Sequence, residues 1–271
     1  MQYREFIIDA LQQASGMALG YFGKVTSTIK QDDNNQVLTE ADIAIGREVI
    51  SLISAAYPDH NIIDEEAGVI DRGSDFTWVV DPIDGTSNFA QGVPTYAIII
   101  GLLHRGVPVA GGVALPAFSE ICIAEKGKGA FCNGQRLSVS PESSLSSVLL
   151  AYGIDGKHKD PSATRDEAKL MGELVLNIRN LRASGSVFDG VMLAKGKYGG
   201  YLYRTSRIWD HVGMHIVIEE AGGVYTDFFG KPQDYKNPLK KVSENYTLCA
   251  STSSLHGQLQ KIIHDSGLQD K

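Results

Sequence analysis

The most informative stretch of the chain reads Trp78-Val-Val-Asp81-Pro-Ile-Asp84-Gly-Thr-Ser-Asn-Phe89. The apolar run 78–80 predicts a buried strand, which delivers two aspartates three residues apart into a turn that Pro82 stiffens. The residues after Asp84 suit the start of a helix, whose first backbone N–H groups can hold a phosphate. Carboxylates beside such a phosphate site are the ligands that Mg²⁺ prefers. An isolated Asp-Pro-Xaa-Asp is more often only a capped turn, but the complete string favours a magnesium and phosphate site.

The spacing of the two aspartates separates this site from two other phosphate-binding motifs. The loop GxxxxGK[ST] of nucleotide triphosphatases is absent from the sequence. Phosphatases of the haloacid dehalogenase type resemble D-x-D-G-T, with aspartates two residues apart and the first acting as nucleophile. Because the spacing here is three, we expect direct attack by a metal-activated water molecule rather than a phosphoaspartate.

The hydrophobic pattern around this stretch predicts a mixed α/β fold. Helical spacing indicates helices over 2–23 and 39–57, the second ended by Pro58. Short β-type runs follow at 61–63, 77–80, 96–103, 109–114, 120–124 and 148–151. The second half alternates, with helices expected at 164–176, 184–194, 208–221 and 253–264 and strands at 224–226 and 247–250. No linker composition separates the halves, so we expect one domain over 1–271, built of two layered halves at about 1–145 and 146–271.

Composition excludes several classes of protein. The 271 residues are 43% hydrophobic and 21% charged, which is typical of a globular protein and not of a disordered chain. The 25 basic and 32 acidic residues give a net charge of −7 without a basic block, so we expect no nucleic-acid partner. The 3 cysteines lack metal-ligand spacing, and neither a signal peptide nor a membrane span is evident. These features predict a cytoplasmic protein that does not bind a membrane.

Several motifs together resemble the inositol monophosphatase family, the Mg²⁺-dependent, lithium-sensitive phosphatases. The stretch 78–89 looks like the family signature, and further matches lie along nearly the whole chain. They are Thr39-Glu-Ala-Asp42, Asp64-Glu65-Glu66 (one change from the family's G-E-E), Gly127-Lys128-Gly-Ala-Phe131-Cys-Asn-Gly134, Trp209-Asp210-His-Val-Gly213 and Glu220-Ala-Gly-Gly223. The resemblance implies a layered αβαβα sandwich of the sugar-phosphatase type and a homodimer.

The same resemblance implies roles for individual residues. Two or three Mg²⁺ would be bound, the first by Glu65, Asp81 and the carbonyl of Ile83, and the second by Asp81, Asp84 and Asp210. Asp42 and Thr86 would position or deprotonate the attacking water, with Glu65 sharing that environment. The phosphate and the substrate would be bound by Asp84, Gly85, Thr86, Gly185, Ser186, Val187 and Tyr203. Inositol-type members usually have a glutamate where this chain has Tyr203, and Gln36 replaces a supporting aspartate.

Each candidate also has a structural interpretation that the sequence leaves open. Asp42 fits a capping box, Glu65 and Glu66 fit loop charges, and Asp210 fits the first turn of a helix. His211, His215 and Glu219 have a spacing that can ligate a transition metal, although the H-E-x-x-H pattern is absent. Arg204 and Arg207 are either solvated or able to meet a second phosphate.

The sequence therefore predicts an enzyme, a phosphoric monoester hydrolase acting on a small phosphorylated polyol or sugar. Inositol 1-phosphate is the leading substrate, with fructose 1,6-bisphosphate and 3′-phosphoadenosine 5′-phosphate as alternatives within the family. An alternative of another class is a non-catalytic protein that binds a phosphorylated metabolite.

Overall fold

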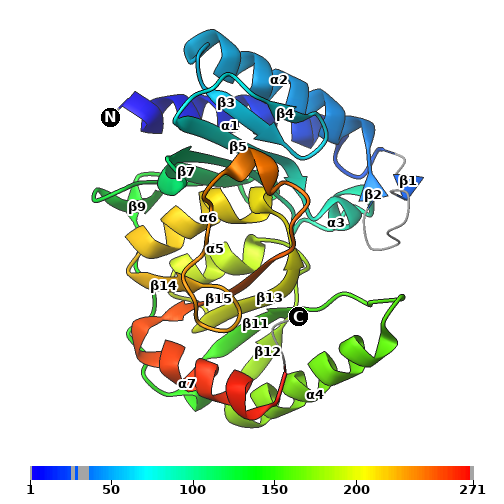
Figure 1. Cartoon of the computed structure of the whole chain (residues 1–271), viewed down its shortest axis with the longest axis vertical. Coiled ribbons are helices and arrows are strands. Elements are labelled where there is room, and N and C mark those ends of the chain that lie inside the picture. The colour runs from blue at the N-terminus through cyan, green and yellow to red at the C-terminus, as the bar shows by residue number, and fades with distance from the viewer. Residues whose placement is uncertain (1, 26–27, 30–36, 269–271) are drawn as a thin grey trace.

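The computed structural model describes residues 2–25, 28–29 and 37–268, and its elements form five alternating layers (Figure 1). A helical layer, an eight-stranded sheet, a second helical layer, a five-stranded sheet and a third helical layer follow one another. Over the described residues the helices are α1 (Gln2–Tyr21), α2 (Glu40–Ala56), α3 (Thr86–Ala90), α4 (Pro161–Asn177), α5 (Phe188–Ala194), α6 (Ile208–Glu220) and α7 (Ser253–Asp265). The predicted αβαβα sandwich is confirmed.

The larger sheet has the strand order β10-β9-β8-β7-β6-β5-β3-β4 and is antiparallel except where β3 pairs with β5. Its strands are β3 (Asn61–Asp64), β4 (Gly68–Ile70), β5 (Phe76–Asp84), β6 (Ala97–His104), β7 (Val107–Leu115), β8 (Glu120–Glu125), β9 (Gly129–Cys132) and β10 (Gln135–Arg136). A separate two-stranded ribbon pairs β1 (Thr28–Ile29) with β2 (Val37–Leu38). Both faces of the larger sheet are covered by helices (Figure 1), which explains why its central strands are apolar throughout rather than alternating.

The two faces of that sheet have separate cores. Trp78, Ile98 and Ile100 face α1 and α2 and pack with residues such as Leu11 and Ile45. The intervening residues Val79, Ile99 and Leu103 face the opposite side, toward α6. This alternation follows from the two-residue period of a strand, so Asp81 lies on the α6 side.

The smaller sheet has the order β12-β11-β13-β15-β14, with β11 parallel to both β12 and β13. Its strands are β11 (Leu149–Gly153), β12 (Asn180–Arg182), β13 (Gly200–Ser206), β14 (Gly223–Thr226) and β15 (Tyr246–Thr252). Helices α5 and α6 lie between the two sheets, and α4 and α7 cover the outer face (Figure 1). No helix in the described ranges is long and apolar enough to cross a membrane.

Most predicted elements are present with shifted ends, but the start of one helix was wrong and several strands were not predicted, namely β4, β9, β10, β12 and β13 among those of the two large sheets. The helix expected over 184–194 begins only at Phe188, because Ser184 donates its N–H to the Asp189 carboxylate and Gly185 takes a φ of 73°. The longest of these, β13, begins with Gly200 after Gly199, and these glycines concealed the strand pattern that follows.

Helix α6 lies unusually close to the larger sheet because glycines face one another there. A Cβ atom on Gly213 would lie 2.6 Å from Ile99 Cγ2 and 2.9 Å from the Ile100 carbonyl oxygen. On the sheet side, a Cβ atom on Gly101 would lie 2.6 Å from the Gly213 nitrogen, and one on Gly111 would lie 2.8 Å from its Cα. No side chain larger than hydrogen fits at this contact without moving the backbone.

We therefore expect Gly213→Ala to lower the free energy of unfolding by about 1–3 kcal/mol through overpacking. The measurement is urea denaturation followed by circular dichroism. Gly172→Ala on α4 is the control, because a Cβ atom there meets nothing within 4 Å and alanine favours helix by up to about 1 kcal/mol. Equal stability of the two variants would contradict the close-contact interpretation.

Candidate active site

A β-bulge at the end of β5 brings Asp81 and Asp84 to the same side. Asp81 lies opposite Ile99 on β6 and Asp84 lies opposite Ala97, so three steps on β5 match two on β6. In a regular strand, residues three apart would face opposite sides, and the extra residue removes this difference. Pro82, which has no N–H to donate, lies inside the bulge. The N–H of Ile83 donates to Asp81 Oδ1 at 3.0 Å and fixes that carboxylate.

The third carboxylate comes from the first turn of α6. The N–H of Arg207, the residue before the helix, donates to Asp210 Oδ2 at 2.7 Å. Ligand oxygens of Asp81, Asp84 and Asp210 all lie within 4.8 Å of one another, the one such cluster of potential metal ligands in the described part of the chain. The close approach of α6 to the sheet therefore places its N-terminal acid against the end of β5.

Like charges and burial act together on these acids. Burial raises the pKa of Asp81 well above its ordinary value, and the neighbouring Glu65, Asp210 and Asp84 raise it further. Burial and then Asp210 raise the pKa of Asp84 in the same way, although its hydrogen bond from the Val187 N–H opposes the shift. Such a cluster is unfavourable unless protons or cations neutralise it.

The cluster opens into a cavity of about 290 Å³. It is lined by Glu65, Asp81, Ile83, Asp84, Gly85, Thr86, Ser87, Asn88, Asp155, Gly185, Tyr203, Thr205, Ser206, Arg207, Trp209 and Asp210. Most of the residues proposed from the sequence are therefore brought together. The lining also contains residues that the sequence analysis did not propose, and Asp155 is the most important of them. The one sequence signal for Asp155 is its position shortly after the predicted strand that corresponds to β11.

Asp42 does not line the cavity, but it contacts Thr86, which does. The Thr86 hydroxyl is 3.2 Å from Asp42 Oδ1 and donates to the Ile83 carbonyl at 2.9 Å. Asp42 also accepts the N–H of Thr39 at 2.8 Å, forming the capping box of α2. Burial raises the pKa of Asp42. The capping interpretation is therefore confirmed, and the same side chain also contacts Thr86 at the cavity; its role toward water stays a prediction.

The turn after Asp84 depends on a glycine. Gly85 has a φ of 78°, and a Cβ atom there would lie 2.9 Å from the Ser186 Cβ. The neighbouring Val187 donates its N–H to Asp84 Oδ2 at 2.6 Å. Gly185 lines the cavity, whereas Ser186 and Val187 are absent from its lining. The segment 185–187 therefore supports the carboxylate cluster as well as bordering the cavity.

Two other suggestions from the sequence are wrong. His211 bonds to Ser206 Oγ at 2.6 Å and Tyr225 Oη at 2.9 Å, and His215 bonds to Tyr235 Oη and contacts Glu219, so these histidines form a buried polar network rather than a metal site. The side chain of Arg204 lies 3.8 Å from the buried Glu167 and over the Phe228 ring, away from the cavity. Gln36 lies outside the described residues.

The motif at 220–223 has a structural role. Glu220 accepts the N–H groups of Gly127 and Gly129, both at 2.6 Å, and so joins the end of α6 to the turn before β9. The motifs at 127–134 and 220–223, which are far apart in the sequence, therefore meet in one contact.

Without divalent cations, we expect Asp81→Asn to raise the free energy of unfolding near pH 7, on the order of 1 kcal/mol. A carboxyl group with a raised pKa holds its proton more tightly in the folded chain than in the unfolded chain. Stability of the metal-free protein therefore falls as the pH rises from the ordinary pKa of 3.8 through the raised value. Denaturation in a chelating buffer at several pH values measures both effects. A less stable variant with an unchanged pH dependence would contradict this electrostatic assignment.

Comparison with known proteins agrees with this geometry. The sequence profile of the inositol monophosphatase family matches residues 2–267. A "Fructose-1,6-bisphosphatase/inositol-1-monophosphatase" of Thermotoga maritima is 29% identical over 98% of this chain and 97% of its own. A "Nus factor SuhB" of Pseudomonas aeruginosa is 32% identical over 75% of this chain and 76% of its own. The solved structure of a Thermotoga maritima IMPase superposes with a TM-score of 0.85 at 28% identity, covering 97% of both chains. This chain belongs to the inositol monophosphatase family of phosphatases.

Proposed function

We propose that this protein is a Mg²⁺-dependent phosphomonoesterase that hydrolyses inositol 1-phosphate to inositol and phosphate. The observation that carries the proposal is the convergence of Asp81, Asp84 and Asp210 within 4.8 Å beside a cavity that also contains the start of α3. Family membership supports the phosphatase reaction. The magnesium dependence and the substrate are our inference.

The donor set fits Mg²⁺. Every candidate ligand is a hard oxygen, and the buried carboxylates need cations to be fully ionised together. Glu65, Asp81, Asp84, Asp210 and the carbonyl of Ile83 would hold the ions, two or three in number. When bound, the ions supply the positive charge that neutralises these carboxylates, polarises the phosphoryl group and favours ionisation of water.

The chain's own groups then orient the reactants. The first N–H groups of a helix have no partner within it, so those of Gly85 and Thr86 are suited to hold phosphate oxygens. The Thr86 hydroxyl, which contacts Asp42, would orient a water molecule toward phosphorus, and Asp42 would receive its proton. The new O–P bond would form as the ester O–P bond breaks. The leaving alcohol oxygen would take a proton from solvent water, and Asp42 would return the proton that it received to solvent, so that no net proton is gained or lost by the protein.

The size of the cavity favours a small alcohol. About 290 Å³ is at the lower end of the roughly 300–1,000 Å³ typical of ligand sites. A phosphorylated six-carbon polyol fits such a volume better than an adenosine bisphosphate. Fructose 1,6-bisphosphate stays an alternative, because the name of the Thermotoga relative includes both activities.

A non-catalytic role is the alternative of another class, and the name "Nus factor" of some relatives points to functions beyond hydrolysis. This chain has all five acids that the reaction would use: Asp42, Glu65, Asp81, Asp84 and Asp210. The homodimer, the cytoplasmic location and lithium sensitivity stay predictions.

Asp84→Asn is expected to lower kcat/KM by more than about 100-fold, since even outer partners of metal ligands contribute about 10–100-fold. The amide oxygen can still accept from the Val187 N–H, so the variant should fold. Phosphate release measures activity, and thermal melting with added Mg²⁺ measures metal binding. Asp75→Asn, at a carboxylate 57% exposed, is the charge-matched control. Wild-type turnover in Asp84→Asn would refute the proposed site.

Among inositol 1-phosphate, fructose 1,6-bisphosphate and 3′-phosphoadenosine 5′-phosphate, we expect the highest kcat/KM for inositol 1-phosphate. Steady-state phosphate release with Mg²⁺ gives the comparison. A higher kcat/KM for either bisphosphate would contradict inositol 1-phosphate as the preferred substrate. Absence of Mg²⁺-dependent release from a broad panel of phosphomonoesters would favour the non-catalytic alternative.

A further inference from the structure

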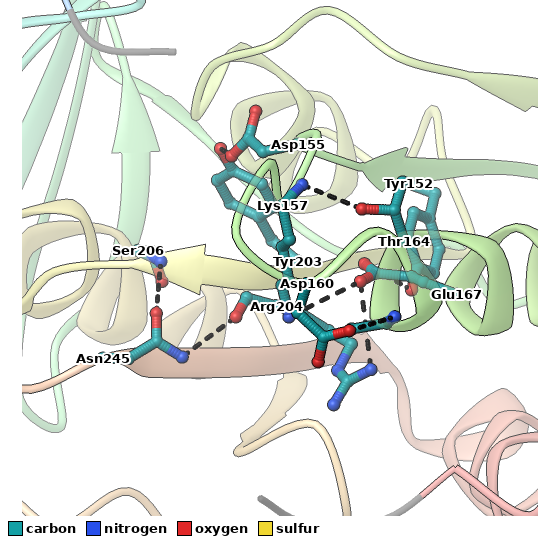
Figure 2. A network of polar contacts seen from close by, with 11 residues as sticks. Tyr152, Asp155, Lys157, Asp160, Thr164, Glu167, Tyr203, Arg204, Ser206 and Asn245 are labelled. Atoms are coloured by element: carbon teal, nitrogen blue, oxygen red, sulfur yellow. Dashed lines mark hydrogen bonds and ion pairs between the residues drawn. The ribbon is translucent and has the colours of Figure 1, made fainter. Parts of the chain in front are cut away.

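Tyr203 and Asp155 form a pair that lines the same cavity as the three clustered aspartates. The Tyr203 hydroxyl donates to Asp155 Oδ2 at 2.6 Å (Figure 2). Burial is the largest cause of the raised pKa of Tyr203. The negative charge of Asp155 is the next cause, and the charges of Asp210 and Asp84 contribute less. The tyrosine therefore stays a hydrogen-bond donor at neutral pH.

A glycine sets the direction of the tyrosine ring. Gly153 lies opposite Tyr203 where β11 pairs with β13. A Cβ atom on Gly153 would lie 2.6 Å from Tyr203 Cδ2 and 2.9 Å from Cε2. The absence of a side chain lets the ring lie across the end of β11, so its hydroxyl reaches the residue two positions further along.

The loop that carries Asp155 is held from its other side as well. The Lys157 N–H donates to Thr164 Oγ1 at 2.8 Å, and its ammonium group lies 4.0 Å from the buried Glu167 (Figure 2). Glu167 also accepts from Tyr152 Oη at 3.0 Å and lies 3.8 Å from Arg204. This network ties the loop 154–160 to α4 and to both adjacent strands, which holds Asp155 at the cavity.

We propose that Asp155 accepts a hydrogen bond from a hydroxyl group on the alcohol part of the substrate, and that Tyr203 and Gly153 are its positioning residues. This inference rests on the proposed function, in which the phosphate occupies the end of the cavity beside Asp84. A carboxylate accepts from hydroxyl groups and repels a second phosphate. The pair therefore selects a polyol monophosphate over a bisphosphate.

The test compares substrates that differ in hydroxyl groups. For Asp155→Asn we expect kcat/KM for inositol 1-phosphate to fall about 10–100-fold, because a charged acceptor is lost. Turnover of 4-nitrophenyl phosphate, whose alcohol part has no free hydroxyl group, should change less than about 2-fold. The ratio of activity on fructose 1,6-bisphosphate to activity on inositol 1-phosphate should rise by about tenfold or more. An equal loss on all substrates, or no loss on inositol 1-phosphate, would overturn the proposal.

Tyr203→Phe tests the positioning role separately. It should raise KM for inositol 1-phosphate while leaving kcat within about 3-fold, and the double variant should be no worse than Asp155→Asn alone. Additive losses would contradict a shared role. Asp166→Asn, an exposed α4 carboxylate outside the cavity lining, is the charge-matched control.

Binding distinguishes failure of this proposal from failure of the proposed function. Calorimetric titration with inositol, in the presence of Mg²⁺ and inorganic phosphate, should show about tenfold weaker binding by Asp155→Asn and unchanged binding of phosphate. If the wild type releases phosphate from no substrate, the proposed function fails, and this titration alone decides the role of Asp155. Equal inositol binding by wild type and variant would then overturn it.

Discussion

The contact between the glycine of α6 and the glycines of the larger sheet is the constraint on which the site depends. Gly213 approaches Gly101 and Gly111 so closely that a methyl group on any of the three would lie within 2.9 Å of a backbone atom. Asp210 lies three residues before Gly213, one turn toward the helix N-terminus. A helix held further from the sheet by side chains would carry its first turn away from Asp81. Packing between layers thus determines the distance between acids that are far apart in the sequence.

The bulge in β5 brings the two acids of the larger sheet to the same side. Two acids three residues apart would face opposite layers of a regular strand, one of them among apolar side chains of α2. The bulge turns Asp84 toward Asp81, and the Val187 N–H compensates part of the resulting repulsion. Energetically, the fold accepts a carboxylate cluster that is unfavourable without cations. We therefore expect the residues that would bind a divalent ion to be the same ones that reduce the stability of the metal-free protein.

The sequence was sufficient for the elements that carry strong local signals and for the acids in the motifs. The strand before Asp81 and the capping box at Asp42 agree with the structure, and so does the αβαβα layering that the family resemblance implied. The sequence was insufficient where tertiary contacts decide the conformation. Strand β13 begins with glycine and has a weak local strand signal, so its pairing with β11 and β15 defines it. The histidines at 211 and 215 have ligand spacing, but their partners come from strands and loops distant in sequence.

The two ends of the cavity differ in whether local sequence or tertiary contacts position their residues. At the phosphate end, the aspartates lie in motifs, because bulge, helix start and ligand must occur at fixed local spacing. At the other end, Asp155 depends on Tyr203 and on the missing side chain of Gly153, which are joined only by the pairing of β11 with β13. Such a pair can change together without disturbing the aspartates. In the function that we propose, catalysis and choice of the alcohol are therefore separable, and motifs that identify the reaction do not identify the substrate.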